Sequence, residues 1–479
     1  MKGSYETMAS SLHIVMLAGI MGIGQTMGQV CPYTDPKCEC NRDWLTCYDL
    51  QQIPPVNRGA SVSHYKYLSF EKGDINSIAK NSLPSGLTEF SSSRHPLTNI
   101  SDDAFDNLAD TLERVDISGA KFNTLPTALK GLTKLTYLVL VDTPIQVWDA
   151  GTLRHIAATL ESIELLNVGL SAWPSWISDF HLLRTIHFSS NSLESIPGDA
   201  FNSFKDSLTN LQLTSAGLTQ IPQALSTLTS LTSLDLSGNN FTDVSEVERI
   251  TESPFAQKLS YLYLNAVEFR KIANFSSLTS LRSISLEINR ISDIPAGSLP
   301  LSLPILYIST NILSSVPKDV ASMSGLEALY MHHNLISEIE PIAFPSSLTH
   351  LELSANNLTI IENTAFKNLN VLRTLRLDNN PISIISPAAF SDLVSLETLS
   401  IIETHLTAIP LAFTRLSSKT DITFSTTQPL SCTCPAPNDL VQWHNSVSMT
   451  MSLMMVECSN GQLVHTYLSG QCGQTTVSP

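Results

Sequence analysis

An apolar template recurs along most of this chain and constrains its fold more than any other feature. The template has the form L-x-x-L-x-L-x-x-N-x-L, and clear copies begin at Leu183, Leu231, Leu348 and Leu372. Fifteen copies follow one another at spacings of 22 to 28 residues. Their first positions are Tyr65, Leu87, Leu112, Leu135, Leu160, Leu183, Leu208, Leu231, Leu259, Leu281, Leu303, Leu326, Leu348, Leu372 and Leu396. A segment of this length cannot bury its own apolar face, so neighbouring copies must stack around one continuous core.

The spacing of apolar residues within each copy predicts a short strand. Template positions 4 and 6 lie on one face because side chains alternate across a strand, and positions 3, 5 and 7 lie on the other. Position 1 and the later apolar positions turn into the same interior. Stacked parallel strands therefore form a curved sheet, and positions 3, 5 and 7 line its concave side.

Period and template together resemble the extracellular leucine-rich repeat family over about three quarters of the chain. The resemblance implies an α/β fold: a leucine-rich-repeat solenoid shaped as a curved horseshoe, with a parallel β-sheet on the concave face and disulfide-stapled caps. It also implies a column of phenylalanines in the return segments. We interpret these residues as convex-side core: Phe105, Phe201, Phe344, Phe366, Phe390 and Phe413.

Asparagine occupies the ninth template position in seven copies. These residues are Asn191, Asn239, Asn289, Asn311, Asn334, Asn356 and Asn380. At this turn a short amide can hydrogen-bond backbone groups of adjacent copies that would otherwise be buried and unsatisfied. The other eight copies depart from the pattern, with Ala120, Thr143, Val168 and Ala216 among the substitutes. We therefore expect the N-terminal half to be less regular.

All eight cysteines lie in two groups near the ends of the chain. They are Cys31, Cys38, Cys40 and Cys47, then Cys432, Cys434, Cys458 and Cys472. Four cysteines in each group predict two small disulfide-stapled caps; zinc binding by the Cys-x-Cys pairs is the alternative, which export disfavours. Both ends resemble the N-terminal and C-terminal cysteine caps of the family. Pairing as in the family would give Cys31–Cys40, Cys38–Cys47, Cys432–Cys458 and Cys434–Cys472, although spacing alone leaves the connectivity open.

The N-terminal segment has the features of a secretory signal peptide. Lys2 precedes an apolar run, residues 12–23, which is too short to span a bilayer comfortably, and small and polar residues follow up to Gly28. We divide the chain into a signal peptide (1–28), an N-terminal cysteine cap (29–62), about fifteen leucine-rich repeats (63–419), a C-terminal cysteine cap (420–472) and a tail (473–479). We expect the mature chain to be secreted into the extracellular space and to carry no membrane span.

Composition and motifs exclude several classes of function. The chain has 43 Asp and Glu residues against 27 Lys and Arg, so it would repel nucleic acids at long range. The sequence contains no HExxH, Walker phosphate loop, GxGxxG after a strand or GxSxG nucleophile elbow. We therefore predict no enzyme activity, no catalytic residues and no cofactor.

Four Asn-x-Ser/Thr sequons predict N-linked glycans. They begin at Asn99, Asn240, Asn274 and Asn357. Asn240 and Asn357 fall at template position 10, and the other two lie in return segments. The predicted glycans therefore leave the concave strand positions free.

The concave positions supply the candidate ligand-binding residues. These are Tyr261, Tyr263, Tyr307, Tyr330, His332, His350, Glu352 and Arg376. Rigid, amphipathic tyrosine rings are typical of binding interfaces. An ordinary solvated sheet face that carries tyrosines by chance is the alternative. Further along the central column, Asp116, Glu164 and Asp235 are interpreted as a solvated acidic face, although they could prefer a basic partner.

The stretch "YMHHN" from Tyr330 raises the question of a metal site. The repeat places Tyr330 and His332 on the concave side, whereas His333 enters the turn and points elsewhere. The two histidines therefore diverge, and we predict no metal site.

These observations favour a secreted leucine-rich-repeat binding protein that recognises an extracellular protein ligand or receptor through its concave β-sheet face. Three alternatives remain open: an extracellular-matrix structural protein, a non-catalytic subunit of a secreted enzyme, and the ectodomain of a membrane receptor without its anchor. The identity of the ligand, the oligomeric state and the choice among adhesion, signalling, immune recognition and matrix roles do not follow from the sequence.

Overall fold

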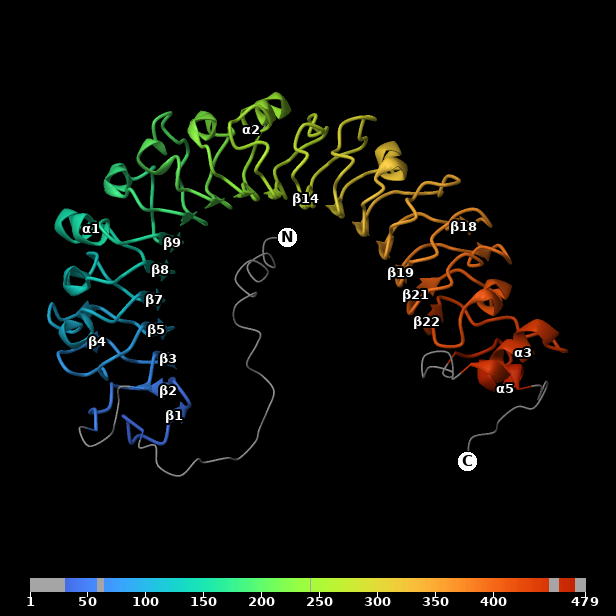
Figure 1. Cartoon of the computed structure of the whole chain (residues 1–479). Helices are drawn as coiled ribbons and strands as arrows, with labels where there is room; N and C mark the ends of the chain where they lie inside the picture. Colours follow the sequence, from blue (N-terminus) through green and yellow to red (C-terminus); the bar gives the residue numbers. More distant parts are fainter. Residues whose placement is uncertain (1–30, 58–63, 242, 448–455, 470–479) are drawn as a thin grey trace.

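The chain forms a horseshoe whose inner wall is one continuous β-sheet (Figure 1). The computed structural model describes residues 31–57, 64–241, 243–447 and 456–469. The predicted signal peptide and the tail 473–479 lie outside these residues. Short helices and loops lie on the outer side of the arc, and a cysteine-rich segment lies at each of its two ends (Figure 1). The predicted leucine-rich-repeat solenoid with a concave parallel sheet is confirmed.

The concave sheet contains 18 strands within the described residues. In chain order they are β1 (Cys38–Asn41), β2 (Trp44–Leu50), β3 (Tyr67–Gly73), β5 (Glu89–Ser93), β7 (Arg114–Ser118), β8 (Tyr137–Val141), β9 (Ser162–Leu166), β10 (Thr185–His187), β11 (Asn210–Gln212), β12 (Ser233–Asp235), β13 (Tyr261–Tyr263), β14 (Ser283–Ser285), β15 (Ile305–Tyr307), β16 (Ala328–Tyr330), β17 (His350–Glu352), β19 (Thr374–Arg376), β21 (Thr398–Thr404) and β22 (Asp421–Thr426). β1 and β2 pair antiparallel, and from β2 onward each strand pairs parallel with the next strand of the sheet.

The return segments carry two small ladders and several short helices. The ladders pair β4 (Ser77–Ile78) with β6 (Asn99–Ile100) and β18 (Ile360–Ile361) with β20 (Ile384–Ile385). The α-helices are α1 (Ala150–Ile156), α2 (Glu248–Thr251), α3 (Asn438–Ser446) and α5 (Val464–Leu468). The 3-10 helices are Asp106–Leu108, Thr127–Gly131, Ser175–Asp179, Asn202–Phe204, Gln223–Thr227, Val244–Val247, Lys318–Ser322 and Leu411–Arg415. Proline precedes each of the five-residue 3-10 helices, where its fixed φ favours the first helical turn.

A left-handed residue at template position 8 marks every copy of the repeat. These residues are Lys72, Arg94, Gly119, Asp142, Asn167, Ser190, Ser215, Gly238, Ala266, Ile288, Thr310, His333, Ala355, Asn379 and Glu403, all with positive φ. In thirteen copies the strand has ended before this residue and the chain turns toward the convex side, whereas Lys72 and Glu403 lie inside β3 and β21. Asp49 near the end of β2, with φ 49°, lies opposite Lys72 of β3, so the N-terminal cap continues the repeat geometry.

The asparagines at position 9 form the predicted hydrogen-bonded ladder. Asn334 Nδ2 donates to the carbonyls of Ile308 and Met331 at 3.0 and 3.1 Å, and its Oδ1 accepts from the amide of Leu313 at 3.0 Å. The other six asparagines make corresponding bonds to adjacent repeats. All seven are buried. Each amide therefore satisfies backbone groups that have no access to water.

The expectation of a less regular N-terminal half is wrong for the sheet. Its strands β3 to β9 are five to seven residues long and stay in register, whereas β10 to β19 are three residues long. Two other side chains take over part of the asparagine role there. Thr143 Oγ1 accepts from Ala120 N at 3.2 Å, and His95 Nδ1 accepts from Ile75 N at 3.4 Å.

The convex side of the core contains the predicted phenylalanine column. All six phenylalanines are at most 3% exposed, which confirms their interpretation as core. Phe344, Phe366, Phe390 and Phe413 stack in series, with ring centroids 6.5, 6.1 and 6.4 Å apart. Phe413 then contacts Trp443 of α3 at 5.8 Å. The column therefore ties the last repeats to the C-terminal cap.

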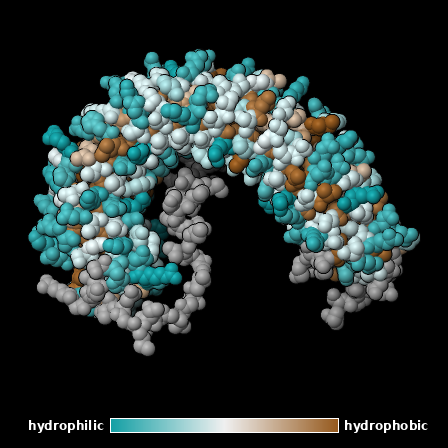
Figure 2. Space-filling model, viewed as in Figure 1, coloured by the Kyte–Doolittle hydropathy of each residue, from teal (hydrophilic) through white to brown (hydrophobic). Residues whose placement is uncertain are grey.

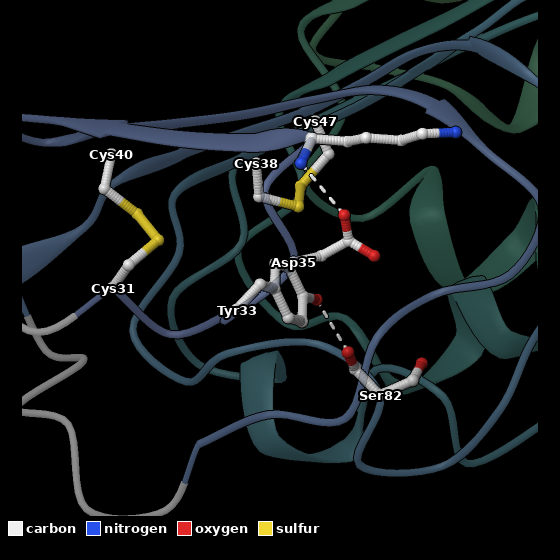
Figure 3. Close-up of a disulfide and its surroundings, with 8 residues drawn as sticks. Cys31, Tyr33, Asp35, Cys38, Cys40, Cys47 and Ser82 are labelled. Carbon is white, nitrogen blue, oxygen red and sulfur yellow. Dashed lines mark hydrogen bonds between the residues drawn. A yellow bond between two sulfur atoms is a disulfide. The ribbon is translucent and has the colours of Figure 1, made fainter.

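Disulfides staple both ends of the solenoid. Cys31–Cys40 and Cys38–Cys47 close the N-terminal cap (Figure 3), and Cys432–Cys458 closes part of the C-terminal cap, as the family pairing implies. The fourth expected pair involves Cys472, which lies outside the described residues. Tyr33 anchors the N-terminal cap by donating a 2.7 Å hydrogen bond to the carbonyl of Ser82 (Figure 3).

Candidate concave-face binding site

Two of the predicted tyrosines form a stacked pair on the concave sheet of the C-terminal half. Tyr307 of β15 and Tyr330 of β16 are direct partners in the parallel register. Their ring centroids lie 4.6 Å apart and the ring planes differ by 8°. Burial raises the pKa of Tyr307, and the neighbouring Tyr330 and Tyr263 add to the shift. The phenol of Tyr307 therefore stays neutral at physiological pH and keeps its hydrogen-bond donor.

The other two tyrosines lie on β13, two strands before Tyr307. Tyr261 is 40% exposed, whereas Tyr263 is half-buried. Between Tyr263 and Tyr307 the register places Ser285, which is only 2% exposed although it occupies an outward position. Its hydroxyl donates a 2.6 Å hydrogen bond to Asn265 Oδ1. Tyrosine rings therefore lie on both sides of this buried serine.

The charged candidates form a continuation of the same column. Glu352 pairs in register with Tyr330 on one side and with Arg376 on the other. Arg376 Nε lies 3.6 Å from Glu352 Oε2 and 3.8 Å from Asp378 Oδ2, and its side chain is 53% exposed. An exposed pair of this kind contributes at most about 1 kcal/mol to stability. The Arg376 guanidinium remains accessible to a partner.

The predicted histidines occupy different environments. His332 is half-buried and its Nδ1 lies 2.8 Å from Ser309 Oγ; burial lowers its pKa, with Glu352 opposing the shift. His350 is exposed, and its Nδ1 lies 2.8 Å from Thr349 Oγ1. In the position-3 column, Ser283, Ile305 and Ala328 separate His350 from Tyr261. Tyr261 of β13 marks one edge of the candidate surface, and Arg376 of β19, one strand beyond His350, marks the other.

His332 and His333 occupy different backbone positions, but their rings do not diverge as predicted, because the centroids lie 5.5 Å apart in an edge-to-face contact. His333 has φ 55° at template position 8 and is exposed, while His332 remains on the sheet. Across the residues that the structure describes, no group of three or more His, Cys, Asp or Glu side chains could hold a metal ion. The absence of a metal site stays a prediction for the whole chain.

A second side-chain network on the concave face was not predicted from the sequence. Arg114 Cζ lies 3.9 Å from the ring centroid of Tyr137, whose hydroxyl donates to Glu164. His187 Nδ1 lies 3.5 Å from the other oxygen of Glu164, and Arg114 also pairs with Asp116 at 3.5 Å. Positions 3 and 5 of the N-terminal repeats contain these residues. Comparing both columns strand by strand would have found them.

The acidic column is therefore only partly solvated, which corrects its interpretation as a solvated face. Burial raises the pKa of Asp116, and Arg114 offsets part of this shift. Burial also raises the pKa of Glu164, but hydrogen bonds from His187 and Tyr137 outweigh it and lower the pKa overall. Burial raises the pKa of Asp235 as well. Asp116 and Glu164 lie inside a polar network and hold rigid positions on the sheet.

Aromatic residues of the N-terminal cap also reach the concave face. Trp44 of β2 pairs in register with Tyr67 of β3, and their rings stack with centroids 4.2 Å apart and planes 16° from parallel. Trp44 and Tyr48 are each 44% exposed. The sequence predicts only a disulfide cap for this segment, because it contains no signal that β2 joins the sheet.

The four sequon asparagines are exposed and lie off the concave strands. Asn99 begins β6 on the return side, and Asn274 lies in a return segment. Asn240 lines an open hollow of about 850 Å³ together with Phe269 and Lys271. Asn357 follows the asparagine ladder residue of its repeat. Their exposure is compatible with glycans, and the glycans themselves stay a prediction.

Apolar side chains also reach the surface away from the concave face. Figure 2 shows hydrophobic stretches on the arm formed by the C-terminal repeats. Ile360 and Ile384, 40% and 53% exposed, are partners in the β18–β20 ladder. Among the described helices, none is long and apolar enough to cross a membrane.

Two stretches of the chain, residues 181–241 and 346–406, match a family model described as leucine rich repeat. Podocan-like protein 1 of Mus musculus is 26% identical over 303 residues, which are 61% of this chain and 47% of the relative. The Homo sapiens protein of the same name is 26% identical over 303 residues, or 61% of this chain and 51% of the relative. The chain thus spans about half the length of the curated relatives it matches.

Solved structures show the same fold at low sequence identity. A leucine-rich-repeat protein of Leptospira interrogans has a TM-score of 0.60 at 22% identity, covering 76% of this chain and 90% of its own. A chain of the Drosophila Toll–Spatzle complex has a TM-score of 0.59 at 18% identity, covering 81% of this chain and 55% of its own. At these identities the likeness concerns the fold alone.

Proposed function

Because this chain is a leucine-rich-repeat protein with cysteine caps, we propose that it is a secreted binding protein that recognises a protein ligand or receptor through its concave β-sheet face. The solenoid presents a rigid surface, so a partner orders few side chains on binding. Recognition then depends on the complementarity of shape and charge. Neither catalysis nor a cofactor is part of the proposal.

The stacked pair Tyr307–Tyr330 carries this proposal. Its rings are held by the parallel register of β15 and β16, so they present contact area at low entropic cost. Aromatic residues near the centre of an interface contribute much of the binding energy. Tyr263, Glu352 and Arg376 flank the pair with hydrogen-bonding and charged groups.

The disulfides and a structural neighbour support an extracellular recognition role. Disulfides persist in oxidising compartments, and three are present among the described residues. The Drosophila neighbour is a complex of Toll with Spatzle, which is a precedent for protein recognition by this fold. The signal peptide, the four glycans and the division into two caps around fifteen repeats form part of the same proposal.

Site-specific crosslinking tests the proposed surface. A photoreactive phenylalanine analogue replaces Tyr330 on the concave face, and in a second protein it replaces Leu335, which is 48% exposed on the flank of the same repeat. Both proteins are irradiated in native extracellular fluid, and the adducts are identified by mass spectrometry. We expect a specific protein adduct at position 330 and none of comparable yield at 335.

A triple alanine variant then measures the contribution of the tyrosines. Replacing Tyr263, Tyr307 and Tyr330 should weaken binding of the crosslinked partner by at least about tenfold, because each truncated anchor removes about 1 kcal/mol or more. The matched control replaces three exposed apolar residues of the flank, Ile288, Ile312 and Leu335, and should bind normally. Unchanged affinity of the tyrosine variant, with its fold intact, would falsify the proposed patch.

A further inference from the structure

The N-terminal end of the concave sheet carries a second exposed aromatic surface. We define the N-terminal aromatic face as Trp44, Tyr48 and Tyr67, which lie on β2 and β3. Trp44 and Tyr67 stack at 4.2 Å, and Trp44 and Tyr48 are each 44% exposed. Leu45 and Cys47, which alternate with these outward residues on β2, are fully buried. The exposed rings therefore belong to a well-anchored strand.

Carboxylates surround this aromatic face. Glu89 is the register partner of Tyr67, and Glu71 is the register partner of Tyr48. Glu39 of β1, paired with Thr46, lies beside them. Burial raises the pKa of Glu89 and of Tyr48, and the charges of Glu39 and Glu71 add to the shift at Tyr48.

Negative charge exceeds positive charge on this part of the sheet. The outward positions of β1 to β9 contain five carboxylates and one guanidinium. They are Glu39, Glu71, Glu89, Asp116 and Glu164, against Arg114. A neutral apolar partner would remove these carboxylates from water without compensation, which is costly. A cationic partner would supply the missing charge.

The same sheet contains an internal example of the required contact. The guanidinium of Arg114 lies over the ring of Tyr137 at 3.9 Å and pairs with Asp116 at 3.5 Å. The Trp44–Tyr67 stack beside Glu89 repeats the aromatic and carboxylate groups of that arrangement. Arginine over an aromatic ring is a recurrent and favourable cation–π contact.

We propose that the N-terminal aromatic face binds an extended, arginine-containing segment of a partner polypeptide. From β2 to β9 the sheet spans five inter-strand spacings, or about 24 Å, which an extended chain of about seven or eight residues matches. Arginine side chains of the segment stack on Trp44 and Tyr67 and pair with Glu71 and Glu89. The inference rests on the proposed function only in that it treats the concave face as a recognition surface.

Fluorescence anisotropy with a synthetic probe tests this inference. The probe is a fluorescein-labelled octapeptide of alternating arginine and serine, and its analogue of alternating glutamate and serine is the charge control. We expect saturable binding of the arginine peptide and no binding of the glutamate peptide. The double variant Trp44→Ala/Tyr67→Ala should bind about tenfold more weakly, while Trp44→Phe, which keeps a ring, should lose less than about threefold.

Charge-matched variants separate this face from general attraction to an acidic protein. Glu71→Gln/Glu89→Gln should weaken binding about fivefold and flatten its salt dependence. Glu194→Gln/Asp199→Asn removes the same charge from exposed residues off the concave strands and should change binding less than about twofold. If this control weakens binding as much, or if Trp44→Ala/Tyr67→Ala binds normally, the inference is wrong.

The tyrosine surface serves as an independent reference. Tyr307→Ala/Tyr330→Ala should bind the arginine peptide with unchanged affinity, because these rings lie on β15 and β16, many strands away from β2 and β3. Loss of peptide binding in this variant would place the cationic segment on the tyrosine pair and overturn the assignment to the cap. The proposed function would survive such a result, since its own test uses the crosslinked partner.

Discussion

The N-terminal and C-terminal halves of this solenoid stabilise the same repeat fold with different residues. From β10 to β19 most repeats bury an asparagine at position 9, and the last four return segments stack phenylalanines. From β3 to β9 position 9 holds Gly73, His95, Ala120, Thr143 and Val168, yet the strands are longer and the register is unbroken. Stacking of apolar strand positions therefore maintains the sheet, while the turn residue can vary.

The two halves also differ in the surface that they expose. The C-terminal half presents a neutral tyrosine stack beside an exposed Glu352–Arg376 pair. The N-terminal half holds Arg114, Asp116 and Glu164 in a half-buried network around Tyr137. One rigid sheet thus offers two chemically distinct contact regions. Their separation along the arc would allow a long partner to engage both.

The largest expected effect concerns the phenylalanine column. Phe390→Ala should destabilise the C-terminal repeats by about 3–5 kcal/mol, because it leaves a cavity between Phe366 and Phe413. Hydrogen–deuterium exchange should show lost protection in β19 to β22 while β3 to β9 stay protected, since each repeat contacts only its neighbours. Equal loss of protection in both halves would contradict this local role.

The second largest loss of stability is expected from a substitution in the asparagine ladder. Asn356→Ala leaves the amide of Ile336 buried without its acceptor. It also removes one of the two asparagine donors to each of the carbonyls of Met331 and Leu353, which keep Asn334 and Asn380, for a total cost of about 2–4 kcal/mol. Thr143→Val, which removes a single acceptor in the N-terminal half, should cost about 1 kcal/mol. Urea denaturation of both variants measures the difference. Equal losses of unfolding free energy in the two variants would mean that Asn356 stabilises its repeat no more than Thr143 does.

A substitution that relieves backbone strain at template position 8 should have a smaller effect, and it should stabilise the protein. Ile288 is β-branched and has φ 56°, a conformation that such residues rarely adopt. Ile288→Asn should stabilise the protein by about 1 kcal/mol, because asparagine tolerates this region and the side chain is already 39% exposed. Asn167 already occupies the same position with φ 51°, so Asn167→Ile is the reverse control and should destabilise. A lower melting temperature for Ile288→Asn would refute the strain argument.

The smallest expected effect is a pH dependence of folding stability that arises from His95. Burial lowers the pKa of this histidine, with the Gly73 backbone and the Glu71 and Asp74 carboxylates opposing the shift. The unfolded chain binds the proton below about pH 6.5 while the folded chain resists it, so stability falls as the pH drops below that value.

His95→Asn replaces the titrating ring by the ladder residue of the C-terminal half. We expect the variant to lose less stability than the unmodified protein between about pH 7 and pH 5, measured by chemical denaturation at each pH. An identical loss in both proteins would show that His95 has the same proton affinity in the folded and unfolded states. The same substitution also asks whether an N-terminal repeat accepts an asparagine at this turn.

Much of the architecture was predictable because the repeat encodes it locally. Alternation of side chains across a strand assigned Leu234 to the core and Asp235 to the concave face, and one register then applied to every copy. The complete central column follows from this rule, including the partnership of Tyr307 with Tyr330. The same register assigned His332 to the concave face and His333 to the turn, although it did not predict that their rings stay in contact. Within the part of the chain that the structure describes, three of the family disulfide pairings are present, and the fourth involves Cys472 outside it.

The tertiary structure alone decided how neighbouring side chains meet. Whether two tyrosines in register stack, and whether Glu164 faces Tyr137 and His187 together, depends on rotamers that several strands select jointly. The pairing of β2 with β3 likewise joins residues that no shared template links, and it places Trp44 on the concave face. Periodicity determines which face a residue occupies because it is a property of one strand. Contacts across strands require the packed sheet, because their energies depend on atoms that the sequence brings together only after folding.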